Sequence, residues 1–331
     1  MVSKVQFKLI LVLAGAVTWL GLVGFSAAAE PGVYPVKSVK IVVPFPPGGS
    51  NDIIARLVGR KLAELTGQAF VVENRAGAAG NVGADAVARS EPDGYTLLLT
   101  APPPLTTNAA LYDKMLFDPG KAFAPVALIA TVPIVLVVHP SSGITNVKEL
   151  IAVAKAKPGT LNFGSSGNGS TNHLAGMLLK RRAEIDVIHV PYKGAAPALS
   201  DLIAGHIPMM FDNIPALLPQ IHSKSINAIA VAGATRAKAL PHVPTVAESG
   251  LPDFEASAWF GLVAPGQTPP LILAKLQAAL DVILKTTDIK SRFDELGAEP
   301  STVAGADFRR FLAEETNKWS KIIKESGAKA D

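Results

Sequence analysis

Residues 40–57 read Lys40-Ile41-Val42-Val43-Pro44-Phe45-Pro46-Pro47-Gly48-Gly49-Ser50-Asn51-Asp52-Ile53-Ile54-Ala55-Arg56-Leu57. The β-branched run at the start favours a strand, and the Pro and Gly residues that follow favour a tight loop. Apolar residues then recur with helical spacing, at Ile53, Ile54, Leu57, Val58 and Leu62. The stretch therefore predicts a strand, a loop and a helix in succession.

The loop of this unit has the composition of an anion-binding site. Gly48 and Gly49 let backbone N–H groups approach a ligand because they lack a Cβ atom, and Ser50 or Asn51 can cap the helix. Helix N-termini carry partial positive charge and unpaired donors, so they can hold an anion without Lys or Arg. The same residues also suit an ordinary strand-to-helix turn, and this loop alone does not separate the two interpretations.

The composition limits the class of protein. The 331 residues are 49% hydrophobic and 18% charged, which is enough for a large core and predicts two domains. The absence of cysteine excludes disulfides, a thiol nucleophile and Cys-ligated zinc, and we expect no lipid-anchored N-terminus. The densest basic cluster, Lys180-Arg181-Arg182, ends a predicted helix where cations suit the dipole, so we expect no nucleic-acid partner.

Residues 1–29 are typical of a signal peptide. Lys4 and Lys8 precede an apolar run over 9–25, and Ala27-Ala28-Ala29 supplies a small-residue cleavage site. An uncleaved N-terminal anchor is the alternative because the run is long, but the Ala-rich ending favours cleavage near Ala29. Cleavage removes two positive charges and no negative ones, so the formal net charge falls from +4 to +2. We expect a soluble periplasmic product.

Strand-like and helix-like segments alternate from Val36 onward. Predicted strands lie at 39–43, 69–73, 95–100, 127–129, 134–138, 160–163, 187–190, 208–211, 226–232 and 259–264. Predicted helices lie at 53–65, 147–155, 174–180, 196–204, 214–222, 269–285 and 306–324, with one more ending at 87. This alternation is typical of α/β proteins with mixed, mostly parallel sheets flanked by helices.

A second glycine-rich loop follows the predicted strand at 160–163. Gly164-Ser165-Ser166-Gly167-Asn168-Gly169-Ser170-Thr171-Asn172-His173 leads into a helix, so the order of strand, polar glycine loop and helix N-terminus is repeated. The strands at 187–190 and 208–211 also end in small or polar residues before a helix. Because open α/β sheets bind ligands at the carboxyl ends of their strands, this repetition predicts a cleft.

Two α/β lobes, joined by strands that cross near Pro133 and Trp259, would bring both glycine loops to one crevice. We expect lobe 1 to comprise residues 30–132 and 255–331 and lobe 2 to comprise residues 133–254, in a monomer. Each lobe would direct helix N-termini inward. That arrangement suits a carboxylate better than a phosphate ester, which usually also recruits Lys or Arg.

Motifs for covalent or metal chemistry are weak in this sequence. It has no P-loop, and the six histidines show no metal-ligand spacing, so we expect no cofactor and no metal. Gly164-Ser165-Ser166-Gly167 resembles a nucleophile elbow only loosely. An exported α/β serine hydrolase using Ser165 or Ser166 with His173 is therefore the alternative function.

Four side chains near the predicted cleft have competing interpretations. His173 contacts the ligand or caps its helix. Asp212 accepts from a ligand hydroxyl or ammonium, or caps the next helix. Lys193 adds charge to the anion site or lies in solvent. For Tyr192 we favour packing along a ligand.

Six motifs together resemble the periplasmic solute-binding receptors of tripartite tricarboxylate transporters, the Bug or TctC-like proteins. The motifs are Val43-Pro44-Phe45-Pro46-Pro47-Gly48-Gly49-Ser50-Asn51-Asp52, Glu73-Asn74-Arg75-Ala76-Gly77-Ala78-Ala79-Gly80-Asn81, Asp93-Gly94-Tyr95-Thr96-Leu97-Leu98, Asn162-Phe163-Gly164-Ser165-Ser166-Gly167, His189-Val190-Pro191-Tyr192-Lys193-Gly194 and Phe211-Asp212-Asn213. The resemblance spans essentially the whole mature chain. It implies a two-lobed Venus-flytrap fold, no enzymatic activity, and capture of a carboxylated solute for a membrane complex of one large and one small subunit.

The resemblance also implies which residues hold carboxylate oxygens, directly or through water. They are Gly48, Gly49, Ser50 and Asn51 of one lobe and Ser166, Thr171 and His173 of the other. With neighbouring positions on the loops and strand ends, the candidate ligand-binding residues are Pro46, Gly48, Gly49, Ser50, Asn51, Asp52, Gly80, Asn81, Thr100, Ala101, Ser165, Ser166, Thr171, His173, Tyr192 and Asp212.

The stretch Ala101-Pro102-Pro103-Pro104-Leu105 departs from the family pattern, which commonly shows small polar residues and a histidine here. A more apolar, stiffer wall weakens the case for citrate. We therefore expect a less polar mono- or dicarboxylate, either aromatic or longer aliphatic. A ligand receptor that feeds a sensor system instead of a transporter is a further alternative.

Overall fold

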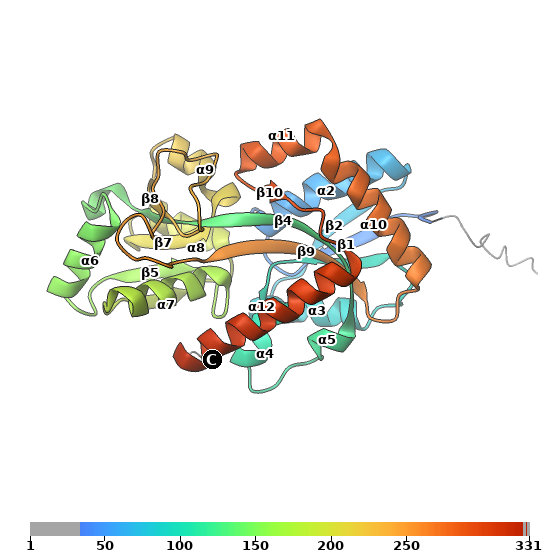
Figure 1. The fold of residues 1–331 in the computed structure, drawn as a ribbon, viewed down its shortest axis with the longest axis horizontal. Helices are drawn as coiled ribbons and strands as arrows, with labels where there is room; N and C mark the ends of the chain where they lie inside the picture. Colours follow the sequence, from blue (N-terminus) through green and yellow to red (C-terminus); the bar gives the residue numbers. More distant parts are fainter. Residues whose placement is uncertain (1–33, 327–328, 330–331) are drawn as a thin grey trace, which may run out of the picture. The chain divides into compact units, whose positions relative to one another are not determined.

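The computed structural model describes residues 34–326 and residue 329 (Figure 1). Contacts within the chain set Pro35–Asp331 apart as one compact unit. The predicted signal peptide lies outside the described residues. Within residues 34–326, no helix combines the length and the apolar composition that a bilayer span requires.

A mixed β-sheet forms the centre of the compact unit. Its strands are β1 (Val39–Val43), β2 (Phe70–Asn74), β3 (Thr96–Thr100), β4 (Phe123–Val138), β5 (Asn162–Ser165), β6 (Ile188–Pro191), β7 (Met209–Asn213), β8 (Asn227–Val231), β9 (Ser257–Pro265) and β10 (Glu299–Pro300). The strand order is β2-β1-β3-β9-β4-β7-β5-β6, and β8 and β10 also pair with β4. β1 runs parallel to β2 and β3, and β5 runs parallel to β6 and β7. β4 and β9 are antiparallel to their neighbours.

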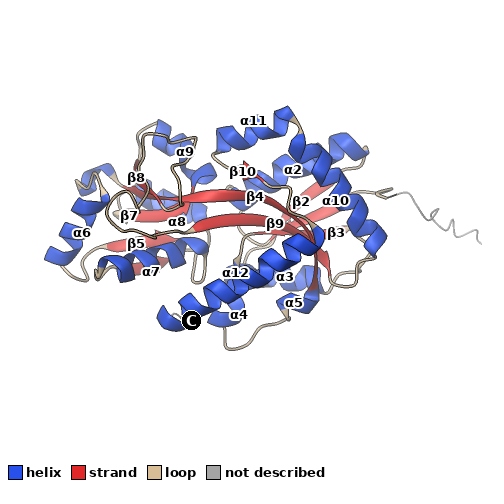
Figure 2. Cartoon of the chain, viewed as in Figure 1, coloured by secondary structure: helices blue, strands red, loops and turns tan. Residues whose placement is uncertain are grey.

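Helices cover both faces of this sheet (Figure 2). They are α2 (Ser50–Thr66), α3 (Asn81–Ala88), α4 (Asn108–Leu111), α5 (Pro119–Ala122), α6 (Val147–Ala156), α7 (Thr171–Ala183), α8 (Ala195–Ile203), α9 (Ile214–His222), α10 (Pro270–Lys285), α11 (Thr287–Leu296) and α12 (Gly305–Ser326). Short 3₁₀ turns occupy η1 (Ala78–Gly80) and η3 (Pro140–Ser142), and a π-helical turn occupies η2 (Pro103–Thr107). The sequence indicated the long helices but not α11 or the turn η2.

β4 and β9 run side by side and link the two halves of the sheet (Figure 1). β4 pairs with β9 over 123–133 and with β7 and β8 over 134–138. The predicted interruption at Pro133 is wrong, because β4 is continuous from Phe123 to Val138. Pro133 pairs with Ser257 at the point where the partner of β4 changes from β9 to β7 and β8. Proline has no N–H to donate, and at this point the ladder of hydrogen bonds passes from one partner strand to the next. The lobe boundaries themselves stay a prediction.

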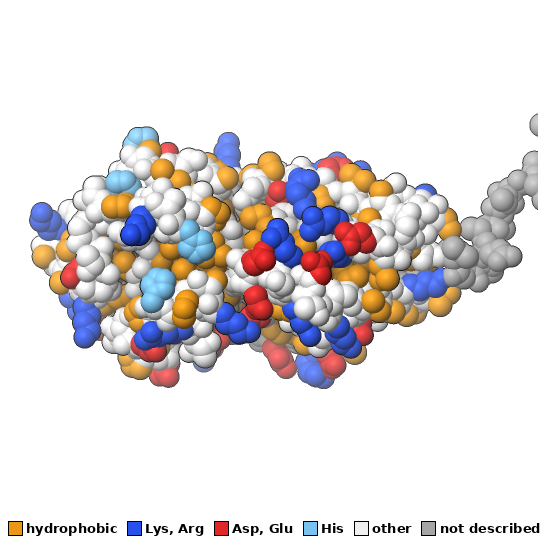
Figure 3. All heavy atoms as spheres, turned by 90° about the horizontal axis from the view of Figure 1, so that it is seen from above, with side chains coloured by type: hydrophobic (Ala, Val, Ile, Leu, Met, Phe, Trp, Pro, Cys, Tyr) orange, Lys and Arg blue, Asp and Glu red, His pale blue; other side chains and the backbone are white. Residues whose placement is uncertain are grey.

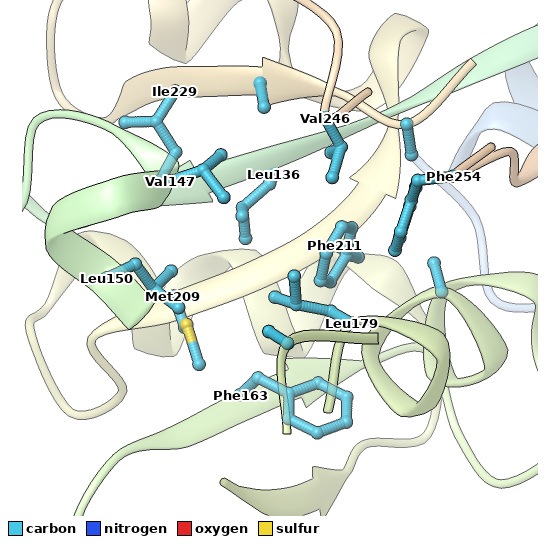
Figure 4. Packing of buried hydrophobic residues seen from close by; sticks show 14 of the residues in the cluster. Leu136, Val147, Leu150, Phe163, Leu179, Met209, Phe211, Ile229, Val246 and Phe254 are labelled. Atoms are coloured by element: carbon cyan, nitrogen blue, oxygen red, sulfur yellow. The ribbon is translucent and has the colours of Figure 1, made fainter. Parts of the chain in front are cut away.

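Separate apolar clusters stabilise the two halves of the sheet. In one half, Phe163, Met209, Phe211 and Leu179 belong to one cluster of buried apolar residues (Figure 4). In the other half, Trp259 packs edge-on against Phe308, which is fully buried. These clusters fix the strands from whose ends the glycine loops emerge.

Charged side chains of both signs lie next to one another on the face seen in Figure 3. Ion pairs of the described chain include Lys61 with Asp288 at 2.6 Å and Lys238 with Asp294 at 3.8 Å. Each pair has at least one well-exposed side chain, so each contributes little to stability. The visible charges on this face are mixed, so the face has no large patch of one sign that would attract an anion.

Candidate ligand-binding cleft

The two glycine loops meet at one narrow cavity, as the sequence predicts. It measures about 30 Å³, which is room for roughly two water molecules. The cavity is lined by Phe45, Pro46, Gly49, Ser50, Asn51, Ala101, Pro103, Ser166, Ser170, Thr171, Asn172, Ala195, Asp212 and Asn213. Residues from both halves of the sheet therefore face the same narrow space.

The first residues of four helices form much of this lining. α2 contributes Ser50, α7 contributes Thr171, α8 contributes Ala195, and Asn213 is the N-cap of α9. Each of these N-termini carries partial positive charge and backbone donors without helical partners. The lining residues include no Lys, Arg or His. The cavity thus favours an anion through backbone groups and polar side chains rather than through a cationic side chain.

The first loop is held by an ion pair that lies outside the cavity. Gly48 adopts a φ of +84° and its N–H donates to Asp52 Oδ2 at 3.1 Å. Arg56 Nη2 lies 2.8 Å from Asp52 Oδ1. Burial pushes the pKa of Asp52 upward, but the hydrogen bonds from Arg56 and from the Gly48 N–H outweigh burial and lower it. Asp52 therefore stays ionised and fixes the loop.

The predicted capping of α2 by Ser50 or Asn51 is wrong. The N-cap is Gly49, which has no side chain, and both polar residues lie inside the first helical turn. Ser50 Oγ and Asn51 Oδ1 are buried without a hydrogen-bond partner in the structure. Because they do not serve the helix, they are available to a ligand in the cavity.

The second loop is held by uncharged groups. Ser170 caps α7 by accepting a hydrogen bond from the His173 N–H at 3.1 Å. His173 Nδ1 accepts from the Gly169 N–H at 3.1 Å, and its ring stacks on His189 with centroids 4.0 Å apart. Burial lowers the pKa of His173 to about 4, and burial together with His173 lowers that of His189 to about 3. Both rings are therefore neutral at pH 7.

This geometry corrects two predictions for the second loop. His173 neither caps α7 nor lines the cavity, since its ring supports the loop from behind. The predicted pairing of Ser165 or Ser166 with His173 is also wrong, because Ser165 Oγ lies 2.6 Å from His189 Nε2 and Ser166 Oγ accepts from Asn172 Nδ2 at 3.0 Å. Ser165 is fully buried, so no substrate reaches it as a nucleophile.

Asp212 lies at the end of β7 and joins three elements around the cavity. Its Oδ1 accepts from Asn172 Nδ2 and from the Asn213 N–H, each at 2.7 Å. Its Oδ2 is buried without a partner. Burial raises the pKa of Asp212 to about 7, against the lowering effect of the hydrogen bonds from Asn213 and Asn172. The predicted capping by Asp212 is wrong, because Asn213 is the N-cap of α9.

A wider pocket of about 620 Å³ adjoins the narrow cavity and shares Phe45, Pro46 and Ser166 with it. Its other lining residues are Pro44, Ala76, Gly77, Ala78, Ala79, Gly80, Tyr112, Gly167, Asn168, Pro191, Tyr192, Lys193 and Gly194. This volume lies within the range of small-molecule sites. The narrow cavity suits a compact polar group and the wide pocket suits the rest of a ligand.

The structure brings together most of the sequence-predicted residues. Pro46, Gly49, Ser50, Asn51, Ala101, Ser166, Thr171 and Asp212 line the narrow cavity, and Gly80 and Tyr192 line the wide pocket. Gly48, Asp52, Asn81, Thr100, Ser165 and His173 line neither. Asn81 Oδ1 accepts from Asn108 Nδ2 at 2.8 Å, and Thr100 Oγ1 donates to the Ala101 carbonyl at 3.1 Å.

Sequence reasoning missed six residues of the narrow cavity, namely Phe45, Pro103, Ser170, Asn172, Ala195 and Asn213. Several stand beside predicted residues in the same loops, and Asn213 and Ala195 lie at the starts of helices. The rule that helix N-termini face the cleft, applied to α8 and α9 as well, would have found these two. Among the described residues, no group of three or more His, Asp and Glu side chains could hold a metal ion.

The fold and the cleft define this chain as a periplasmic binding protein of the α/β type. A sequence profile of the tripartite tricarboxylate transporter family receptors matches residues 54–328, and the chain belongs to that family. BugT of Bordetella pertussis is 37% identical over 312 residues, which cover 94% of this chain and 96% of BugT. The family is one of solute-binding receptors, not of enzymes, so the alternative of a serine hydrolase is not supported.

Solved structures extend this likeness. An R. palustris protein solved with adipate is 38% identical, with a TM-score of 0.88, covering 90% of this chain and 100% of the other. MatC from Rhodopseudomonas palustris, solved with bound malate, is 33% identical, with a TM-score of 0.81, covering 88% of this chain and 100% of MatC. The predicted two-lobed binding-protein fold class is thereby confirmed.

Proposed function

We propose that this protein is a periplasmic receptor that captures a small organic carboxylate between its two lobes and delivers it to a tripartite tricarboxylate-type membrane transporter. The observation that carries the proposal is the cavity lined by the first residues of α2, α7 and α8, by the N-cap residue of α9 and by no cationic side chain. Four helix N-termini supply enough backbone donors and positive potential to bind one carboxylate group.

The ligand we propose is a mono- or dicarboxylate with an aliphatic or aromatic body, not citrate. A carboxylate would occupy the narrow cavity, and the remainder of the molecule would extend into the wide pocket. Ala101, Pro103, Phe45 and Pro46 give the narrow cavity an apolar wall. This wall offers nothing to the hydroxyl group of malate or to the hydroxyl and third carboxylate of citrate, whose desolvation would go uncompensated.

Capture follows from contacts that only the closed state makes. The cavity is built from residues of both predicted lobes, 30–132 with 255–331 and 133–254, so a ligand bound there favours closure about β4 and β9. We further propose that the signal peptide is cleaved near Ala29 and that the mature receptor is monomeric and serves one large and one small membrane subunit.

A binding screen tests the proposed function. Residues 30–331 are exposed to adipate, terephthalate, benzoate, malate, citrate and inorganic phosphate, with the unfolding temperature and calorimetry as readouts. We expect adipate or an aromatic acid to stabilise the protein most. Stabilisation by citrate or malate alone would refute the proposed ligand class, and no response to any organic acid would refute the receptor function. Labelling by a serine-directed fluorophosphonate would revive the hydrolase alternative.

A further inference from the structure

Four buried polar oxygens around the narrow cavity lack hydrogen-bond partners: Ser50 Oγ, Asn51 Oδ1, Asp212 Oδ2 and Asn213 Oδ1. Each residue is at most 8% exposed. Burying such atoms unpaired is costly, and all four residues line one cavity, so these atoms are the candidates for contacts that a ligand completes.

Three of these groups can become donors without any change of protonation. The Ser50 hydroxyl rotates, and the amides of Asn51 and Asn213 can present their NH₂ groups by turning about the last side-chain bond. Asp212 differs, because an ionised carboxylate only accepts hydrogen bonds. Two ionised carboxylates facing each other in one water-poor cavity repel strongly. A carboxylate ligand and an ionised Asp212 are therefore incompatible neighbours.

Hydrogen bonds hold one carboxyl oxygen of Asp212 in place and leave the other available to donate a hydrogen bond. Asn172 and the Asn213 N–H both bind Oδ1, which leaves Oδ2 as the buried oxygen without a partner on a residue that lines the cavity. In the described part of the chain, no Lys, Arg or His hydrogen bonds to or pairs with Asp212, so no cationic side chain stabilises its charged form.

The titratable groups on the surrounding elements are occupied elsewhere. On α2, Asp52 pairs with Arg56. His173 of α7 stacks on His189 of β6, and both rings are neutral at pH 7. The register partner of Asp212 on β4 is the apolar Val135, and the first residue of α9 is Ile214. At the rim of the wide pocket, Lys193 is exposed and Tyr192 Oη donates to Asp201 Oδ2 at 2.7 Å.

We propose that Asp212 binds the ligand carboxylate as a neutral carboxylic acid that donates through Oδ2, so that each capture event takes up one proton above neutral pH. This inference rests on the proposed function and adds how the site recognises its ligand. The burial that raises the pKa of Asp212 to about 7 supports it, because protonation then needs little free energy near neutral pH.

Calorimetry with adipate and terephthalate between pH 5.5 and 8.5 tests the proposal. We expect the Kd to be nearly constant below pH 6.5 and to rise about tenfold per pH unit above pH 7.5. In two buffers of different ionisation enthalpy, binding at pH 8.5 should take up about one proton, whereas binding at pH 5.5 should take up almost none.

The variant Asp212→Asn separates the proton from the shape of the side chain. Asparagine can accept from Asn172 and from the residue 213 N–H through its oxygen while presenting N–H to the ligand, as the neutral acid does. We expect its Kd to be independent of pH and tighter than that of the wild type at pH 8.5. Asp186→Asn is the matched control, because Asp186 forms a surface ion pair with Lys180 at 2.7 Å and should leave the pH profile unchanged.

Each outcome decides the point. If either acid binds without proton uptake, or if Asp212→Asn keeps the wild-type pH profile, the inference fails and the receptor function stands. If aspartate or glutamate binds best at high pH and Asp212→Asn abolishes that binding, then Asp212 acts as an ionised acceptor for an ammonium group and the inference also fails. A protein that binds no organic acid overturns both proposals.

Discussion

The two glycine loops present helix N-termini to the same cavity but are held in place by opposite means. The loop before α2 is fixed by the ionised Asp52, which accepts from the Gly48 N–H and pairs with Arg56. The loop before α7 is fixed by neutral groups, the stacked rings of His173 and His189 and the hydroxyl of Ser165.

This difference indicates that both loops keep cationic side chains out of the narrow cavity. Arg56 is the nearest cation on α2, yet its side chain is 53% exposed and its guanidinium pairs with Asp52 outside the lining. The histidines under the second loop have strongly lowered pKa values and stay uncharged. In the narrow cavity, whose lining has no Lys, Arg or His, a ligand carboxylate then meets oriented dipoles instead of a cationic side chain. Four predictions test this comparison.

The largest effect is expected at Gly49, whose absent side chain leaves the cavity open. A Cβ there would lie 3.7 Å from Ala195 Cβ, and Gly49 has an ordinary φ of −82°, so a larger residue can fold. Gly49→Leu should fill the cavity and weaken binding of the acid found in the screen by about 100-fold or more, which is about 2.7 kcal/mol. Calorimetry measures the loss, with circular dichroism as the check on folding.

Gly48→Ala provides the comparison within the same loop. Gly48 does not line the cavity, and a Cβ there would meet nothing within 4 Å, but its φ of +84° is unfavourable for alanine. We expect a loss of about 1 kcal/mol in stability and a Kd within about threefold of the wild type. Equal losses of affinity in both variants would contradict the geometry of the first loop.

The second loop should respond to acid before the first. The pKa values of His173 and His189 are lowered to about 4 and about 3 in the folded state, so the unfolded chain binds protons first as the pH falls below 6.5. Stability contributed by the neutral rings is complete above pH 6.5 and is lost toward pH 3. The pKa of Asp52 is lowered from 3.8, so the stability that its ionised form contributes is lost only below about pH 4. Thermal unfolding at pH 6.5 and 4.5 measures this.

His189→Gln isolates the histidine contribution, since glutamine can still reach the Ser165 hydroxyl. We expect the wild type to lose about 1–2 kcal/mol more than this variant between pH 6.5 and 4.5. The raised pKa of Asp212 acts in the opposite sense, because its stabilising effect is lost as the pH rises from 3.8 toward about 7, but it is common to both proteins. Parallel pH profiles would show that the histidine pair does not sense acid.

The sequence predicted the order of strands and helices and the convergence of the two loops, because these follow from local patterns. Periodicity marks β1 and α2, and the glycine and hydroxyl residues mark the turns. The continuity of β4 through Pro133 was not predictable from local propensity, since it depends on where a distant strand, β9, ceases to be the partner.

The roles of individual polar residues were also beyond the sequence. His173 and Asp212 both precede or open helices, and sequence position alone suggested capping for each. What decides their roles is burial and the partners brought from elsewhere in the chain, His189 for the first and Asn172 for the second. Such tertiary contacts override the local preference for caps.

A smaller effect is expected when the apolar wall of the narrow cavity is made more polar, which tests the preference for a less polar ligand. Ala101→Ser adds one hydroxyl to a buried position of the narrow cavity. A hydrogen bond to a ligand hydroxyl is worth about 0.5–1.5 kcal/mol, so the ratio of malate to adipate affinity should rise by about two- to tenfold. Competition calorimetry with both acids measures the ratio. Ala109→Ser, which lies in a separate pocket beside α12, should leave the ratio unchanged.

The smallest effect on affinity is expected at Arg56, where the contrast between the loops is most direct. Arg56→Gln removes the cation that pairs with Asp52, and because the Asp52 side chain is only 7% exposed, the loss should cost about 1–3 kcal/mol in stability. Because the guanidinium pairs with Asp52 and does not line the cavity, the Kd should change by less than about threefold. The dependence of the Kd on salt should match that of the wild type between about 20 and 200 mM, over which the Debye length changes roughly threefold. A tenfold loss of affinity, or loss of a salt dependence present in the wild type, would mean that Arg56 attracts the ligand and that helix N-termini do not suffice.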